Sequence, residues 1–163
     1  MPSGANMSAW CEFKIVWMCC ADQKPLGRLE VPRALLSLQS VNSLTGVQIF
    51  PDAEHGQDGH WQFPRLSVGW YEEGDGYVVR CCETATSNPC LLARSGELSV
   101  PEIYIEHLGL SQELWPRELF VPYERVVQAV EHFLSTGFQH RQLDWVGLFD
   151  FPRHTVPPRP RLR

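Results

Sequence analysis

The chain has 163 residues, of which 44% are hydrophobic and 20% charged, and its formal net charge is −5. This length suits one domain with its own core, and the composition is that of a soluble globular protein rather than a disordered or fibrous one. No segment approaches the roughly 20 consecutive apolar residues of a membrane span, and the apolar stretch near the N-terminus lacks the features of a signal peptide. We therefore expect a single-domain cytoplasmic protein that has no membrane partner.

The N-terminal third predicts a short strand and a short helix. Residues 1–10 are small, polar and unpatterned, which predicts a disordered end before a folded domain of residues 11–151. Alternating apolar residues predict a strand over Glu12–Met18, and Lys24–Gly27 reads as a turn. Pro32 is placed to begin a helix that runs to Gln39 with Leu35, Leu36 and Leu38 on its apolar side. A brief strand over Val47–Phe50 and a polar loop over Pro51–His60 follow.

The centre of the chain is rich in strand patterns. Leu66–Tyr71 and Tyr77–Cys82 flank the segment Glu72–Gly76, whose glycines and Asp-Gly step suit a hairpin turn. Cys90–Ala93 and Glu102–Glu106 are further predicted strands, and Ser111–Leu119 reads as a loop.

The C-terminal part predicts a helix followed by a strand. Pro122 suits a first helical turn, because its missing N–H would have no partner there, and Gly137 suits a left-handed C-cap. Between them the apolar stripe consists of Val126, Val127, Val130, Phe133 and Leu134. Leu143, Trp145 and Leu148 then lead out as a strand. The predicted fold class is therefore α+β, an antiparallel meander with a short N-terminal helix, a longer C-terminal helix and a final strand.

Several short motifs occur in a characteristic order. They are Leu66–Trp70 followed by Gly76–Val79, then Val121-Pro122, Phe133-Leu134, Thr136-Gly137 and Leu143-Asp144-Trp145. Together, over roughly Phe63 to Val146, they resemble the first-numbered immunity-protein family of bacterial polymorphic toxin systems. Many members of that family place a proline in the turn where this chain has His140-Arg141. The resemblance implies an α+β protein that binds and neutralises a secreted toxin domain, often one with a deaminase fold.

Charge is unevenly distributed along the chain. Residues 152–163 are rich in proline and contain four arginines and no acid, which predicts an extended disordered tail. Without these four charges, the total of −5 becomes −9 for residues 1–151. An acidic body suits a basic partner, although moderate acidity also serves solubility alone. Four arginines on such a body make a poor nucleic-acid footprint, so we expect no direct nucleic-acid binding.

No catalytic, metal or cofactor motif stands out. The six cysteines, at positions 11, 19, 20, 81, 82 and 90, form no C-x-x-C pair, and buried free thiols are expected. His55 and His60 share an acidic loop with Asp52, Glu54 and Asp58, but the loop lacks a calcium-loop spacing. We find no G-x-S-x-G and no phosphate loop. The protein is therefore expected to be neither an enzyme nor dependent on a cofactor or metal.

The predicted contact surface combines aromatic and acidic residues, a common arrangement at protein interfaces. Its residues are Trp70, Tyr71, Glu72, Glu73 and Asp75 around the hairpin, and Glu113, Trp115 and Glu118 in the loop before the last helix. Trp70 and Trp115 also suit core positions. The expected partner is a cognate toxin domain, bound by a monomer in a one-to-one complex. Two alternatives are a small enzyme that uses Cys90 or Cys81 with a distant histidine, and an adaptor that uses the arginine-rich tail.

Overall fold

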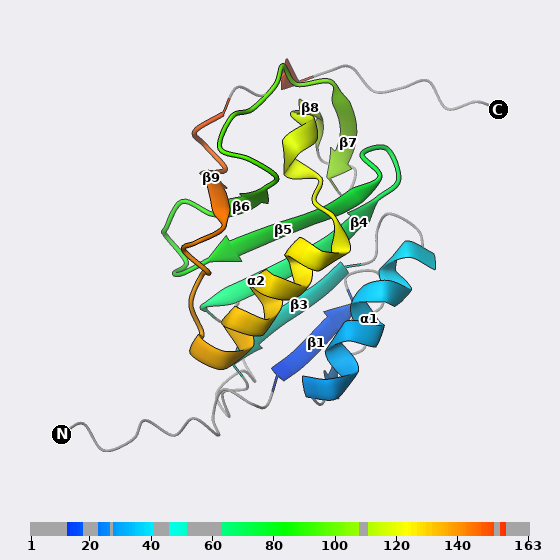
Figure 1. Cartoon of the computed structure of the whole chain (residues 1–163), viewed down its shortest axis with the longest axis vertical. Helices are drawn as coiled ribbons and strands as arrows, with labels where there is room; N and C mark the ends of the chain where they lie inside the picture. The colour runs from blue at the N-terminus through cyan, green and yellow to red at the C-terminus, as the bar shows by residue number, and fades with distance from the viewer. Residues whose placement is uncertain are drawn as a thin grey trace.

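The computed structural model (Figure 1) describes residues 13–17, 23–26, 28–40, 46–51, 63–107, 111–151 and 154–155. Within them the strands form two antiparallel sheets, one of seven strands in the order β2-β1-β3-β4-β5-β6-β9 and one of three in the order β10-β8-β7. The strands are β1 (Phe13–Trp17), β2 (Gln23–Leu26), β3 (Gly46–Pro51), β4 (Arg65–Tyr71), β5 (Gly76–Cys82), β6 (Cys90–Ala93), β7 (Ile103–His107), β8 (Ser111–Trp115), β9 (Asp144–Gly147) and β10 (His154–Thr155). The helices are α1 (Val31–Ser37) and α2 (Tyr123–Thr136), with 3-10 turns at Arg28–Glu30, Leu38–Ser40 and Arg117–Leu119. The predicted α+β fold class is confirmed.

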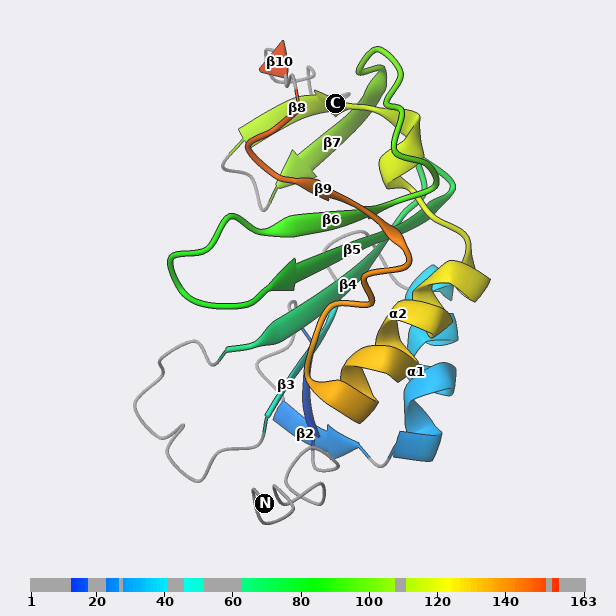
Figure 2. The ribbon, with the colours of Figure 1, turned by 60° about the vertical axis from the view of Figure 1, so that its left-hand side comes forward.

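Both helices cover the same face of the large sheet (Figures 1 and 2). Because successive residues of a strand point to opposite faces, Tyr77 and Val79 of β5 face the helices, whereas Val78 faces away. The helix-side core joins these residues to the apolar stripes of the helices. Its members include Val31 and Leu35 of α1, Val47 and Ile49 of β3, and Val126, Val130 and Phe133 of α2, each exposed by 2% or less. Burying each such side chain stabilises the fold by about 1.5–3 kcal/mol.

A second core lies on the other side of β5 and β6. Val78, Leu91 and Ala93 pack there with Ile105 of β7 and Trp115 of β8. Leu119, Phe120 and Phe151 complete this cluster. Figure 2 shows the small sheet at the end of the molecule away from β2 and β3. Strands β5 and β6 are therefore covered on both faces of the sheet, which explains why β5 is buried at six of its seven positions.

The C-terminal helix follows its sequence signals closely. Pro122 is the N-cap residue, and Gly137 ends α2 with φ 73°, in the left-handed region where a Cβ is unfavourable. The Gly137 N–H donates to the Phe133 carbonyl at 2.7 Å. The buried stripe contains Ala129, whereas Val127, expected in the stripe, is only partly buried. Leu36 of α1, also expected on an apolar side, is 49% exposed.

Two segments expected as turn or loop are strands, so those predictions were wrong. Lys24 to Leu26 belong to β2, the outer strand of the large sheet, the position in a sheet where a proline is tolerated. Ser111 to Trp115 form β8, which pairs with β7 from His107↔Ser111 to Ile103↔Trp115. The strand β8 depends on its pairing with β7, because the mostly polar run Ser111–Leu114 carries little strand signal of its own.

The ends of the chain and one long loop lie mostly outside the described residues. These are residues 1–10, residues 52–60 of the predicted polar loop Pro51–His60 and most of the tail from 152 to 163. Within that tail, His154 and Thr155 form β10 and pair with Leu114 and Glu113 of β8, so strand pairing continues past residue 151. Of the helices that are described, none combines the length and the apolar content needed to cross a membrane.

Candidate functional site

The β4–β5 hairpin carries three acidic side chains at its tip. Residues 72–75 form the loop, closed by the Asp75 N–H donating to the Glu72 carbonyl at 3.1 Å. Asp75 has φ 46°, and aspartate is one of the few residues besides glycine that adopt this conformation readily. Glu72, Glu73 and Asp75 are all exposed, so three carboxylates project from one tight turn. We call residues 72–75 the acidic tip; its three acids belong to the predicted contact surface, which stays a prediction.

The acidic tip is held rigidly by the segment that precedes α2. Tyr77 and Val121 exchange both main-chain hydrogen bonds, at 2.9 and 2.8 Å. The Tyr71 ring packs edge-on against the Phe120 ring, with 6.0 Å between centroids. Gly74 and Gly76 lie so close to Phe120 that a Cβ at either position would collide with it. Such anchoring reduces the ordering cost when the carboxylates meet a partner.

The two hairpin aromatics serve the fold. Trp70 is partly buried and packs edge-on against Tyr77 at 5.0 Å between ring centroids, on the helix side of the sheet. Tyr71 is partly buried on the opposite side, where burial and then the nearby Glu73 carboxylate raise the pKa of its phenol. Neither ring projects freely beside the three carboxylates, which leaves the acids as the exposed chemistry of the tip.

The second predicted group is built into the protein. Trp115 is 2% exposed in the second core, so its prediction as a surface anchor was wrong; it takes the core position that its sequence also allowed. Its indole N–H donates to the Glu113 carboxylate at 2.8 Å. Glu118 accepts hydrogen bonds from the Ser99 N–H at 3.0 Å and the Ser99 hydroxyl at 2.8 Å. Burial raises the pKa of Glu118, but these hydrogen bonds outweigh it and the net pKa is lowered.

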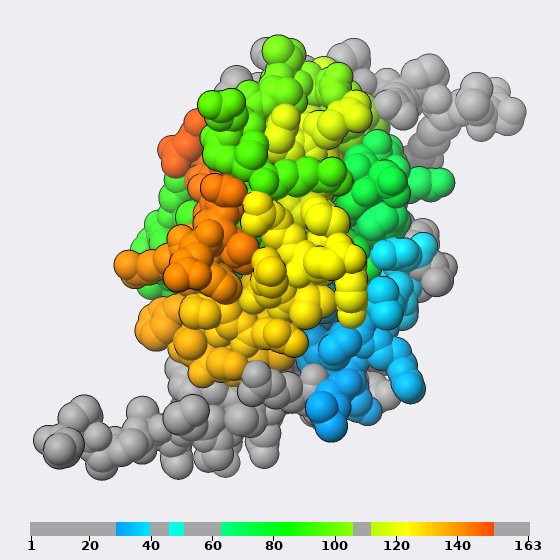
Figure 3. Space-filling model, viewed as in Figure 1, coloured from blue at the N-terminus to red at the C-terminus, as the bar shows by residue number. Residues whose placement is uncertain are grey.

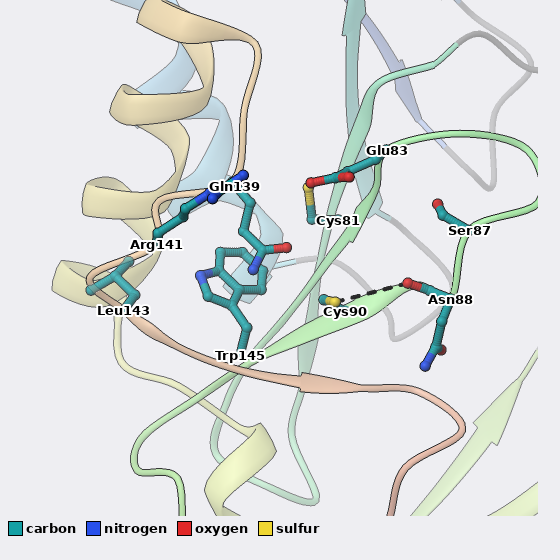
Figure 4. Close-up of a pocket in the computed structure, with 9 residues that line it drawn as sticks. All are labelled: Cys81, Glu83, Ser87, Asn88, Cys90, Gln139, Arg141, Leu143 and Trp145. Carbon is teal, nitrogen blue, oxygen red and sulfur yellow. Dashed lines mark hydrogen bonds between the residues drawn. The ribbon is translucent and has the colours of Figure 1, made fainter.

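A cavity of about 440 Å³ lies at the other end of β5 (Figure 4). One wall comes from β5, β6 and the loop between them, and the opposite wall from the segment that joins α2 to β9. The first wall contains Cys81, Glu83, Ser87, Asn88 and Cys90, and the second contains Gln139, Arg141, Leu143 and Trp145. Its size falls at the lower end of the range for small-ligand pockets. Sequence analysis did not find this cavity, because its walls meet only when β9 pairs with β6.

The two cysteines of the cavity are neutral and face each other across β5 and β6. Cys81 and Cys90 are directly paired in the register of these strands. Burial, reinforced by neighbouring thiols and Glu83, raises the pKa of Cys81 to about 12. Burial, and then the carboxylates of Glu83 and Asp150, also raise the pKa of Cys90. A nucleophilic thiol needs the opposite shift, and no histidine is among the described residues of this cavity.

Histidines and acids give no metal cluster within the described part of the chain. The predicted acidic loop with His55 and His60 lies outside it. His132 and His140 do stack against each other, with 4.4 Å between ring centroids. Burial, and then the charge of His140, lower the pKa of His132.

Comparison with known proteins gives no relative: no protein-family model, no curated protein and no solved structure matches this chain.

Proposed function

We propose that this protein is an immunity protein that binds the toxic domain of a secreted bacterial protein and blocks it. The target is a nucleic-acid-acting domain of the deaminase type, which the bound protein occludes at its active site or substrate groove. The observation that carries the proposal is the acidic tip, where Glu72, Glu73 and Asp75 project from a hairpin anchored to Val121. Such a group is complementary to the basic groove with which an enzyme holds phosphates.

The motifs that resemble immunity proteins support the proposal by their arrangement. The hairpin motif and the helix motif, far apart in sequence, meet where Tyr77 pairs with Val121. The second half of the resemblance continues through α2 and its Gly137 cap into β9. A side-chain hydrogen bond from Arg125 of α2 to Asp144 of β9, 3.2 Å long, joins the last two elements. The motifs thus build one continuous unit behind the acidic tip.

Inhibition of this kind needs no bond-making chemistry. An acidic body steers a basic partner into encounter, and the interface that forms then excludes substrate. The net charge of −9 over residues 1–151 supplies the long-range attraction, and the fixed carboxylates supply the local contacts. The complex is expected to contain one copy of each protein, in the cytoplasm of the producing cell.

The experiment is co-expression with the toxic domain encoded in the neighbouring reading frame, scored by bacterial survival and co-purification. The wild-type chain is expected to rescue growth and to purify with the domain. The triple variant Glu72→Lys, Glu73→Lys, Asp75→Lys should lose rescue, because it opposes the basic groove with like charge. A matched variant with the same charge change at the exposed positions Glu97, Glu124 and Glu131 should keep it. Cell death despite soluble wild-type protein would overturn the proposal for that domain.

A further inference from the structure

We propose that the cavity and the free edge of β9 form a second binding surface, which takes an extended segment of another protein and places an arginine side chain in the cavity. The segment adds a strand beside β9. This surface lies at the end of β5 away from the acidic tip, so the inference goes beyond the proposed function and does not depend on it.

The outer edge of β9 presents main-chain groups that β6 does not use. β9 pairs with β6 on one side, and no described strand pairs with its other side. Beyond the end of β9, the Leu148 N–H donates to the Pro89 carbonyl at 2.7 Å, so the main-chain groups of Leu148 point toward the β6 side. Because this direction alternates along a strand, the main-chain groups of Val146 also point toward β6, whereas those of Trp145 and Gly147 point outward. An added strand can therefore bond to Trp145 and to the Gly147 N–H, as in strand addition at sheet edges.

The cavity opens on the same face to which the Trp145 ring belongs. Trp145 packs with the helix-side core, and Figure 4 shows its ring inside the cavity below Gln139. Leu143 and the neutral thiols of Cys81 and Cys90 supply surface for an aliphatic stem. A guanidinium group stacks well on an indole face, and its planar fork matches a carboxylate.

The charge of the cavity selects a cation at one end. Glu83, which directly follows β5, is exposed and is the acidic side chain among the described residues that line the cavity. The positive group, Arg141, belongs to the opposite wall, which the segment between α2 and β9 forms. Because Glu83 and Arg141 belong to opposite walls, an arginine that enters over Trp145 directs its guanidinium group toward Glu83 and away from Arg141.

Exposed aromatic residues flank the segment that forms the second wall. Phe138 and Phe149 are 63% and 66% exposed, and they stand at the two ends of residues 139–148. The Phe149 N–H donates to the side-chain oxygen of Asn88, which itself lines the cavity, at 3.3 Å. Figure 3 shows this segment, in orange, at the surface beside α2. Large exposed apolar side chains around a pocket are typical of an interaction surface.

The test uses an acetylated, amidated peptide of sequence Val-Thr-Arg-Thr-Val and a matched peptide with citrulline, which has the same shape and no charge, in place of arginine. Binding is followed by NMR of the full-length protein, through the Trp145 indole signal and amide exchange along β9. The arginine peptide should shift the indole signal and slow exchange at Trp145 and Gly147 more than at Val146. The citrulline peptide should bind about tenfold more weakly.

Two exposed substitutions give the matched controls. Glu83→Gln should weaken the arginine peptide by about tenfold while leaving the citrulline peptide unchanged. Glu73→Gln, at the acidic tip, should change neither affinity. Equal binding of both peptides, protection away from β9, or no binding of the arginine peptide would each overturn the inference. Failure to neutralise a toxin would not bear on this result, since no toxin takes part in the test.

Discussion

Tyr77 forms hydrogen bonds both to α1 and to the segment that precedes α2. Its main chain pairs with Val121 ahead of α2, while its hydroxyl donates to the Leu35 carbonyl of α1 at 3.0 Å and accepts from the Gln39 amide at 2.9 Å. Tyr77 is fully buried, so its hydroxyl group is shielded from water. One residue of β5 thus fixes the positions of both helices relative to the sheet.

Tyr77→Phe should lower the free energy of unfolding by about 1–2 kcal/mol, because it removes the buried hydrogen bond from the Tyr77 hydroxyl to the Leu35 carbonyl, which then keeps the Leu38 N–H as donor. Urea denaturation measures the change. Gln39→Leu should cost less, since Gln39 is exposed, and should cost nothing further in the Tyr77→Phe background. A Tyr77→Phe protein as stable as the wild type would show that the hydroxyl contributes nothing to stability.

Two neighbouring substitutions in the acidic tip should differ in their effect on stability. Gly74→Ala should destabilise the fold by about 1–3 kcal/mol, because its Cβ meets the Phe120 ring and forces that ring out of the second core. Asp75→Gly should leave stability unchanged to within about 1 kcal/mol, because relief of the left-handed strain offsets the added chain entropy. Thermal unfolding of the two variants compares them directly. A stable Gly74→Ala protein would mean that Phe120 is free to move.

Cys81 and Cys90 should stay reduced in air. The main-chain N–H and C=O of Tyr77 point toward Val121. Because this direction alternates along a strand, the main-chain groups of Cys81 point toward β6, which makes Cys81 and Cys90 a hydrogen-bonded pair of the ladder. In such pairs the Cβ atoms stand about 5.5 Å apart, whereas a disulfide needs about 3.8 Å. The tryptic peptide of residues 81–94 contains Cys81, Cys82 and Cys90, so alkylation after denaturation without reductant should label all three. A peptide that takes one label only would contradict the prediction.

The stacked histidines predict a loss of stability in mild acid. The pKa of His132 is lowered from its ordinary 6.5, so near and below that pH the unfolded chain binds more protons than the folded one. Stability therefore falls as the pH drops through this window and is restored above it. Denaturation midpoints between about pH 5 and about pH 8 should show this slope. His132→Gln should flatten it; an unchanged slope would assign the pH dependence to other groups.

The sequence predicted elements whose signals are local. Pro122 and Gly137 bound α2 as expected, and the Asp75-Gly76 step closes the central hairpin. These signals act over a few residues and depend on backbone conformation alone, which is why they could be predicted from sequence. The same holds for β3, β4, β5 and β6, whose alternating or apolar runs lie consecutively in the sheet.

What the sequence did not predict depends on pairing between distant segments. The sequence around Trp115 does not indicate whether a core or a partner covers this side chain. Its burial follows from packing against Phe151, with 5.8 Å between the two ring centroids. Likewise, Glu83 and Trp145 share a cavity only because β9 returns to pair with β6 after α2. Local patterns identify the strands but leave this closing pair undetermined.

The position of α2 late in the chain has a consequence for synthesis on the ribosome. The strands β3 to β6 leave the exit tunnel before α2 and can pair with one another, since they are neighbours both in sequence and in the sheet. Their face that will carry Val47, Val68 and Val79 into the core remains without α2 until residues 123–136 emerge. The nascent chain therefore exposes an apolar sheet face. Such a face is the kind of surface that chaperones recognise and that aggregates when translation stalls.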